Sequence, residues 1–320
     1  MARRLHVVSG KGGTGKTTVA AALALALAEQ GRRTLLIEVE GRQGIAQLFE
    51  TEALPYEERR IAIGPGGGEV FALAIDAERA LLDYLQMFYR LGSAGRALRR
   101  LGAVDFATTI APGLRDVLLT GKACEAVRRR GADGRFVYDA VVMDAPPTGR
   151  VTRFLGVNSE VAGLARVGPI HHQAQAVMRV LRSPETAVHL VTLLEEMPVQ
   201  ETADGIAELR AAELPVGATV VNMVRPPVLA AVPDAYGDDP ARLHALAATL
   251  ADAGLPDAAR TAAPLLAQGR AYAHRLVLEA ERRAELARHG IPLHELPLLA
   301  DGIDIAGLYR LARLLRDQEW

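Results

Sequence analysis

The segment GKGGTGKTT (residues 10–18) lies between a short apolar run, residues 5–9, and a long apolar segment, residues 17–30. The run has the length and apolarity of a buried strand, and the long segment predicts a buried helix that ends at Gly31. The intervening loop has the spacing GxxxxGK(S/T), through Gly10, Gly15, Lys16 and Thr17. Between a strand and a helix, this spacing predicts a loop whose backbone N–H groups surround the phosphates of a nucleotide.

The residue types of this loop fit a nucleoside triphosphate better than a dinucleotide. Lys16 is expected to bridge the β- and γ-phosphates, and the Thr17 hydroxyl to take one Mg²⁺ position. The other residues expected to contact the nucleotide here are Gly12, Gly13, Thr14, Gly15 and Thr18. The loop also spells the dinucleotide pattern GxGxxG, with Glu38 in the place of a ribose-binding acid, but a dinucleotide has no use for Lys16 and Thr17. Only three of the 37 basic residues are lysines and two of them lie in this loop, which favours ATP or GTP.

Alternation of apolar runs and helical patterns predicts the fold class. Further strands are expected at residues 34–40, 70–75, 138–143, 187–193 and 217–223, with a weaker one at 292–296. Strand–helix alternation predicts an α/β fold with a mostly parallel central sheet and helices on both faces. Residues 77–130, 159–182 and 238–289 exceed a simple crossover, so we expect helical insertions within a single domain spanning residues 1–320. Their apolar faces either pack on the sheet, the favoured interpretation, or form a groove for a client.

Composition excludes several other classes of protein. The chain has 320 residues with a net charge of -1, which provides no global field for nucleic acid or an anionic membrane. Its single cysteine, Cys124, excludes an internal disulfide framework and a CxxC-type zinc site within one chain. No apolar run approaches the ~20 residues of a membrane-spanning helix. We expect a cytoplasmic protein without stable membrane insertion.

A second segment carries the resemblance to a known family. YDAVVMDAPPTGRVTRFL (residues 138–155) resembles the second switch of the arsenite-pump ATPases and of the related targeting factor for tail-anchored membrane proteins. The form KGGTGKTT resembles the deviant phosphate loop of dimeric ATPases in this class of P-loop NTPases. The resemblance implies that Asp144 orients Mg²⁺ or its water and that Lys11 reaches a partner subunit's nucleotide. It also implies that Asn222 reads adenine with its side-chain amide and that Pro297 lies in the loop closing over the base.

The sequence departs from that family in two places. The first switch of the family has an aspartate that positions the attacking water, and Glu40 stands in its place here. The extra methylene moves the carboxylate by ~1–1.5 Å, a displacement that can slow a reaction strongly. Glu40 is therefore either catalytic or a ribose, switch or structural residue. One cysteine supports neither the pump's arsenite site nor the zinc clasp of the targeting factor.

The resemblance implies a Mg²⁺-dependent ATPase that acts as a nucleotide-gated dimer, and the departure at Glu40 predicts that its hydrolysis is slow. Lys11, Lys16, Glu40 and Asp144 are the expected catalytic residues, and Thr17 and Asp144 the expected metal ligands. The partner is an identical chain or a related subunit, and the client is an unidentified protein or small molecule. The alternative is a scaffold or regulatory subunit that binds ATP without hydrolysing it.

Overall fold

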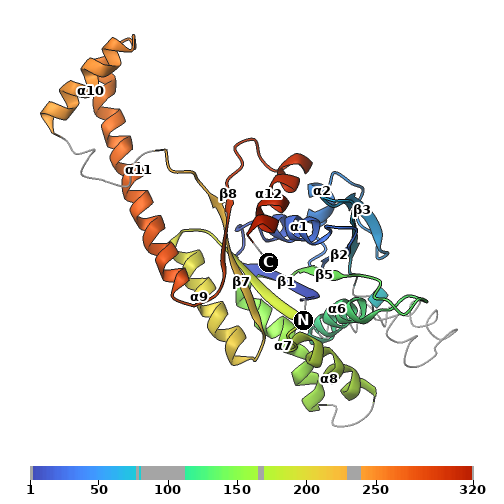
Figure 1. The fold of residues 1–320 in the computed structure, drawn as a ribbon. Helices are drawn as coiled ribbons and strands as arrows, with labels where there is room; N and C mark the ends of the chain where they lie inside the picture. The colour runs from blue at the N-terminus through green and yellow to red at the C-terminus, as the bar shows by residue number, and fades with distance from the viewer. Residues whose placement is uncertain (1–2, 77–78, 81–111, 165–168, 229–238, 319–320) are drawn as a thin grey trace.

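The computed structural model describes residues 3–76, 79–80, 112–164, 169–228 and 239–318. At its centre is an eight-stranded sheet in the order β3-β4-β2-β5-β1-β6-β7-β8 (Figure 1). All neighbouring strands are parallel except the antiparallel pair β3–β4. The strands are β1 (Leu5–Gly10), β2 (Arg33–Glu38), β3 (Arg59–Ile63), β4 (Glu69–Ala74), β5 (Ala140–Asp144), β6 (Thr186–Thr192), β7 (Val216–Val224) and β8 (Leu293–Pro297).

The central strands are apolar because helices cover them on both sides. Every residue of β1, β5 and β6 is buried, which explains their continuous rather than alternating apolar sequences. Successive residues of β1 still face opposite ways, so Val7 packs on one side of the sheet and Val8 on the other. The expected α/β fold with a mostly parallel sheet is confirmed.

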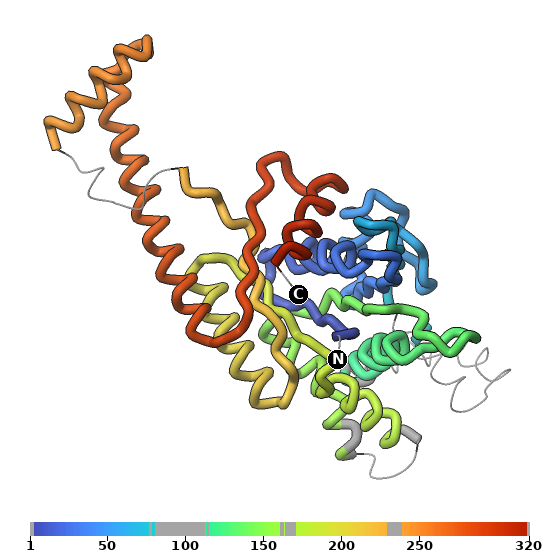
Figure 2. Tube along the Cα trace, viewed as in Figure 1, coloured from blue at the N-terminus to red at the C-terminus, as the bar shows by residue number. Residues whose placement is uncertain are grey.

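Two helical layers complete the body of the protein. One side carries α1 (Lys16–Leu27), the short α2 (Gly44–Leu48) and α12 (Ile305–Asp317), and α1 packs against α12. The other side carries α6 (Pro112–Arg128), α7 (Thr148–Leu164), α8 (Pro169–Leu181) and α9 (Glu196–Ala211). The chain path through these layers is traced in Figure 2.

The helices α10 (Pro240–Asp252) and α11 (Ala258–Ala287) form a hairpin that extends away from the sheet (Figure 1). The described part of α10 contains no buried residue. Near the sheet, α11 packs against α9. This hairpin falls within the insertion expected at residues 238–289, but its outer part does not lie along a face of the sheet.

Other element boundaries differ from the expectations in smaller ways. The strand β3 was not expected, because its residues are exposed or half-buried and lack a strong apolar pattern. Within the insertion expected at residues 159–182, the described residues form the end of α7 and all of α8, and α7 begins earlier, at Thr148. Within the expected insertion at residues 77–130, residues 77–78 and 81–111 lie outside the described residues. Among the helices that the structure describes, none combines the length and apolarity that a membrane crossing requires.

Candidate nucleotide-binding site

The phosphate loop lies where the strand order places a ligand crevice. The central strand β1 pairs with β5 on one side and β6 on the other, and the loop follows its carboxyl end. In open α/β sheets, ligands bind in the crevice outside the carboxyl ends of strands where the connections diverge to opposite sides. Sequence and topology therefore place the candidate site at the same point.

The geometry of the loop leaves room for phosphate. A Cβ atom at Gly10 would lie 2.2 Å from the Val191 carbonyl oxygen, so the loop packs tightly against β6 on its inner side. Cβ atoms at Gly12 and Gly13, by contrast, would meet nothing within 4 Å. At the start of α1, Gly15 provides no side-chain hydrogen bond to the first turn. The loop and the N-terminus of α1 thus offer backbone N–H groups and open space to an anion.

Lys16 and Thr17 meet Asp144 at the adjacent end of β5. The Thr17 hydroxyl donates a hydrogen bond of 2.7 Å to Asp144 Oδ2. Within the described part of the chain, Asp144 Oδ1 is buried and has no hydrogen-bond partner. Burial raises the pKa of Asp144 to about 6, although the Thr17 hydrogen bond and the Lys16 charge act to lower that pKa. This arrangement leaves a desolvated acceptor at the site.

The donors at this point fit Mg²⁺ bound together with a nucleotide. Mg²⁺ is usually held by one or two protein oxygens, substrate phosphates and water rather than by a cage of side chains. Thr17 and Asp144 supply such oxygens. Among the described residues, no group of three or more His, Cys, Asp or Glu side chains forms a metal cage.

The two glutamates at the carboxyl end of β2, Glu38 and Glu40, have different environments. The Glu38 carboxylate is buried and accepts hydrogen bonds from the backbone N–H groups of Gln43 and Ile45, the latter at 3.1 Å. It thereby supports the start of α2, which is a structural role and not that of a ribose ligand. The Glu40 side chain is 24% exposed, and its carboxylate lies 3.8 Å from Arg42. Glu40 also raises the pKa of Asp144, so its charge acts on the candidate site.

Hydrogen bonds of Asn222 and Thr14 fix the conformation of the phosphate loop. The buried Asn222 amide donates a 2.9 Å hydrogen bond from Nδ2 to the Thr14 carbonyl oxygen. The Thr14 hydroxyl in turn donates to the Lys11 carbonyl oxygen at 2.8 Å, so its side chain closes the loop. A Cβ atom at Gly15 would lie 2.4 Å from Asn222 Nδ2, which explains the need for glycine there.

The remaining predicted contacts lie around this centre. Pro297 ends β8 and pairs with Val224 of β7, two residues beyond Asn222. Thr18 is half-buried in the first turn of α1. Lys11 forms an ion pair with Glu201 of α9, with Nζ 2.5 Å from Oε1. The sequence analysis missed Glu201 because 190 residues separate it from Lys11 and no spacing motif connects them.

Helix α6 supplies two more residues that the sequence analysis missed. Arg115 Nη2 donates to the Val39 carbonyl oxygen at 3.4 Å, next to Glu40. The neighbouring Asp116 accepts a 3.0 Å hydrogen bond from Arg150, which follows the Pro-Pro-Thr-Gly segment after β5. The segments after β2 and β5 are thus both bonded to α6. The available signal was a polar residue beside a predicted switch, such as Arg150 after the Pro-Pro-Thr-Gly segment. The sequence does not identify Asp116 as its partner.

Comparison with known proteins identifies the family of this chain. The chain is 53% identical to the ATPase BagA of Mycobacterium tuberculosis over 98% of this chain and 93% of that protein. It is 28% identical to the arsenical pump-driving ATPase of Escherichia coli over 70% of this chain and 40% of that protein. It is also 28% identical to the ATPase GET3 of Kluyveromyces lactis, over 51% and 50% of the two chains. The profile of the anion-transporting ATPases matches residues 3–183. The chain therefore belongs to the anion-transporting ATPase family, whose members include arsenical pump-driving ATPases.

Proposed function

We propose that this chain binds ATP with Mg²⁺ at the phosphate loop and hydrolyses it slowly as a nucleotide-gated dimer in the cytoplasm. The observation that carries the proposal is the buried Asp144 carboxylate, which is bonded to Thr17 through one oxygen and has no partner for the other within the described residues. An unpaired buried acceptor costs free energy unless a ligand satisfies it. Next to a phosphate loop, a hydrated Mg²⁺ ion is the ligand that suits it.

Each residue of the loop has a defined task in this proposal. Backbone N–H groups of residues 12–18 hold the phosphate oxygens, and Lys16 neutralises charge on the β- and γ-phosphates. Thr17 and Asp144 hold Mg²⁺, which supplies further neutralisation of the triphosphate oxygens when bound. Glu40 orients the attacking water and accepts its proton. Because Glu40 is longer than aspartate, the water is less well positioned and hydrolysis is slow.

The hydrogen bond of Asn222 supports adenine over guanine as the base. The Thr14 carbonyl oxygen can only accept, so the Asn222 group facing it is the NH₂ group. The amide oxygen of Asn222 therefore remains for the base. Adenine offers a 6-amino donor that this oxygen can accept, whereas guanine offers a second acceptor at that position. ATP is thus the preferred nucleotide.

Dimer formation is proposed from Lys11. This lysine would neutralise phosphate charge in a facing subunit, and to do so its ammonium group must leave Glu201. The facing subunit is a second copy of this chain or a related ATPase. The proposed client is a protein or small molecule whose binding depends on the nucleotide state.

The second candidate function is an ATP-binding scaffold without turnover. Glu40 favours it, because this carboxylate differs in length from the expected aspartate and has Arg42 beside it at 3.8 Å. Such a subunit would use ATP to assemble with a hydrolysing partner.

The first test measures ATP binding and ATP turnover on the purified protein, together with its mass with and without nucleotide. Lys16→Ala is expected to lose both binding and turnover, whereas Glu40→Gln keeps binding and loses turnover. Glu208→Gln, an exposed carboxylate on α9, is the matched control and is expected to behave as the wild type. Tight binding by the wild type without turnover would favour the scaffold. Absence of ATP binding by the wild type would contradict both candidates.

A further inference from the structure

The residue after Asn222 has an unusual backbone conformation. Met223 adopts a φ of 57° within β7, although residues with side chains rarely occupy the left-handed region. The pairing of β7 with β8 shifts register between Val221 and Val224, so Met223 lies within this irregularity. Irregularities of this kind re-aim side chains and occur often next to functional sites.

The irregularity separates two neighbouring side chains. Asn222 is 5% exposed and its amide donates to the phosphate loop, whereas Met223 is 39% exposed. The Met223 side chain also lies close to the loop, because its Cε atom would be 3.4 Å from a Cβ atom at Gly15. A methionine therefore stands at the rim of the candidate site, next to the residue that faces the base.

Burial of apolar surface does not explain this strained conformation. A left-handed methionine that is 39% exposed loses backbone free energy and recovers only part of the free energy that full burial would provide. Strained residues of this kind cluster where the strain serves ligand binding. A flexible, polarizable thioether makes favourable contacts with flat aromatic rings.

We propose that Met223 forms an apolar wall against the purine base of the bound nucleotide. The inference rests on the proposed function and adds to it a positioning residue for the base. Asn222 distinguishes adenine from guanine through its hydrogen bond, whereas Met223 contributes affinity to any purine because a thioether does not read the base edge. Met223 takes no part in binding the phosphates.

The test compares two glycine substitutions at left-handed positions. Met223→Gly removes the wall, and Gln30→Gly is its matched control, since Gln30 is exposed, has a φ of 54° and lies beyond the far end of α1. Isothermal titration calorimetry of each protein with ATP and with inorganic pyrophosphate separates base contacts from phosphate contacts. A third variant, Met223→Leu, keeps an apolar side chain at the same strained position.

Met223→Gly is expected to weaken ATP binding about tenfold, the upper range for a thioether–ring contact, and to leave pyrophosphate binding unchanged. Met223→Leu should retain most of the ATP affinity, and Gln30→Gly all of it. An unchanged ATP affinity in Met223→Gly, or an equal loss for ATP and pyrophosphate, would overturn the inference while leaving the proposed function intact. A wild-type protein that binds neither ligand would instead contradict the proposed function itself.

Discussion

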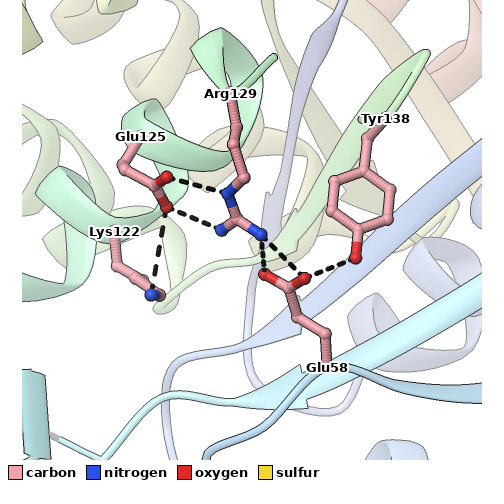
Figure 3. A network of polar contacts seen from close by, with 5 residues as sticks. All are labelled: Glu58, Lys122, Glu125, Arg129 and Tyr138. Carbon is pink, nitrogen blue, oxygen red and sulfur yellow. Dashed lines mark hydrogen bonds and ion pairs between the residues drawn. The ribbon is translucent and has the colours of Figure 1, made fainter. Parts of the chain in front are cut away.

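The phosphate loop and the Arg129 cluster are both charged, but they differ in how far their polar atoms are paired. The Arg129 cluster comprises Glu58, Lys122, Glu125, Arg129 and Tyr138 (Figure 3). Arg129 donates to both carboxylate oxygens of Glu125, at 2.8 and 2.7 Å, and to Glu58 at 2.8 Å. The Tyr138 hydroxyl also donates to Glu58, at 2.6 Å. At the phosphate loop, by contrast, one oxygen of Asp144 is unpaired among the described residues.

The pKa shifts reflect the same difference. The hydrogen bonds that Arg129 donates to Glu125 raise the pKa of Arg129 and keep it charged. Burial raises the pKa of Asp144 to about 6, which disfavours its charge. A charged cluster whose members satisfy one another's hydrogen-bonding groups stabilises the fold. A desolvated carboxylate with an unpaired oxygen can instead bind a cation. The pairing of the polar atoms, more than the presence of charge, therefore distinguishes a structural cluster from a candidate site.

The largest expected effect tests the structural half of this comparison. Arg129→Met should lower the free energy of unfolding by about 2–3 kcal/mol, because it leaves Glu58 and Glu125 partly buried without their main donor. Urea unfolding measures this loss, and ATP affinity should not change. Arg60→Met, which removes an exposed pair with Glu69, is the control and should cost no more than about 0.5 kcal/mol. Loss of ATP binding in Arg129→Met would contradict the structural role assigned to the Arg129 cluster.

The second prediction concerns two buried histidines on neighbouring strands, His6 of β1 and His189 of β6. His189 Nδ1 accepts a hydrogen bond from the Ala218 backbone, so its Nε2 carries the proton and donates to His6 Nδ1 at 3.1 Å. Nε2 is then the protonated ring nitrogen of the buried His6 side chain. Burial lowers the pKa of His6 to about 4 and also lowers the pKa of His189. Both rings are neutral in the folded protein at pH 7.

Stability should therefore fall as the pH is lowered below 6.5. The unfolded chain takes up protons on both histidines in this range, whereas in the folded chain His6 stays neutral until the pH approaches 4 and the pKa of His189 is also lowered. His6 alone should cost roughly 2 kcal/mol between pH 7 and pH 5. Asp144, whose pKa is raised, acts in the opposite direction over this range, so unfolding is best compared in the Asp144→Asn background. Adding His6→Asn should make the pH dependence clearly shallower, and an unchanged slope would contradict the assignment.

The third prediction contrasts two buried carboxylates. Asp144→Asn removes a desolvated charge, so the free protein should be unaffected or stabilised by up to about 1 kcal/mol, while Mg²⁺-dependent ATP affinity falls about tenfold or more. Asp116→Asn instead weakens a satisfied pair with Arg150 and should destabilise the protein by about 1 kcal/mol. Thermal unfolding and calorimetry with ATP, with and without Mg²⁺, measure both effects. Equal destabilisation by the two substitutions would remove the distinction between them.

The sequence predicted best what depends on local spacing. The strand, loop and helix around Lys16 follow from consecutive residues, and the placement of Asp144 at the end of a parallel strand brings it to the same edge of the sheet. The β3 strand was missed because it lies at the edge of the sheet, with β4 as its one neighbour among the described strands, and carries two arginines with little apolar alternation.

Pairs between distant residues could not be predicted from one sequence. The Tyr138 hydroxyl and Glu58 are 80 residues apart, and Asn222 is 208 residues from its acceptor at Thr14. Each such residue alone has many possible partners, and only the packing of helices on the sheet selects one. The resemblance gave Asn222 a role at the base, but its second hydrogen bond to the phosphate loop depends on the folded geometry.

The smallest effect on stability, and the most specific one, is expected at the ion pair of Lys11 and Glu201. This pair belongs to the phosphate loop but is paired as in the Arg129 cluster. Lys11 is paired with Glu201, but both side chains are partly exposed, 31% and 37%, so the pair contributes no more than about 0.5 kcal/mol to folding. If Lys11 acts across a dimer, Glu201 competes with the partner's nucleotide for its ammonium group. Glu201→Gln should then lower the protein concentration needed for ATP-dependent dimers a few-fold, as measured by analytical ultracentrifugation. Glu208→Gln, with the same change of charge on the same helix, should not. An equal change of the dimerisation concentration in both variants would show that the effect comes from net charge. A change in Glu201→Gln alone would show that Lys11, despite its ion pair, is available to a ligand like the unsatisfied groups of the phosphate loop.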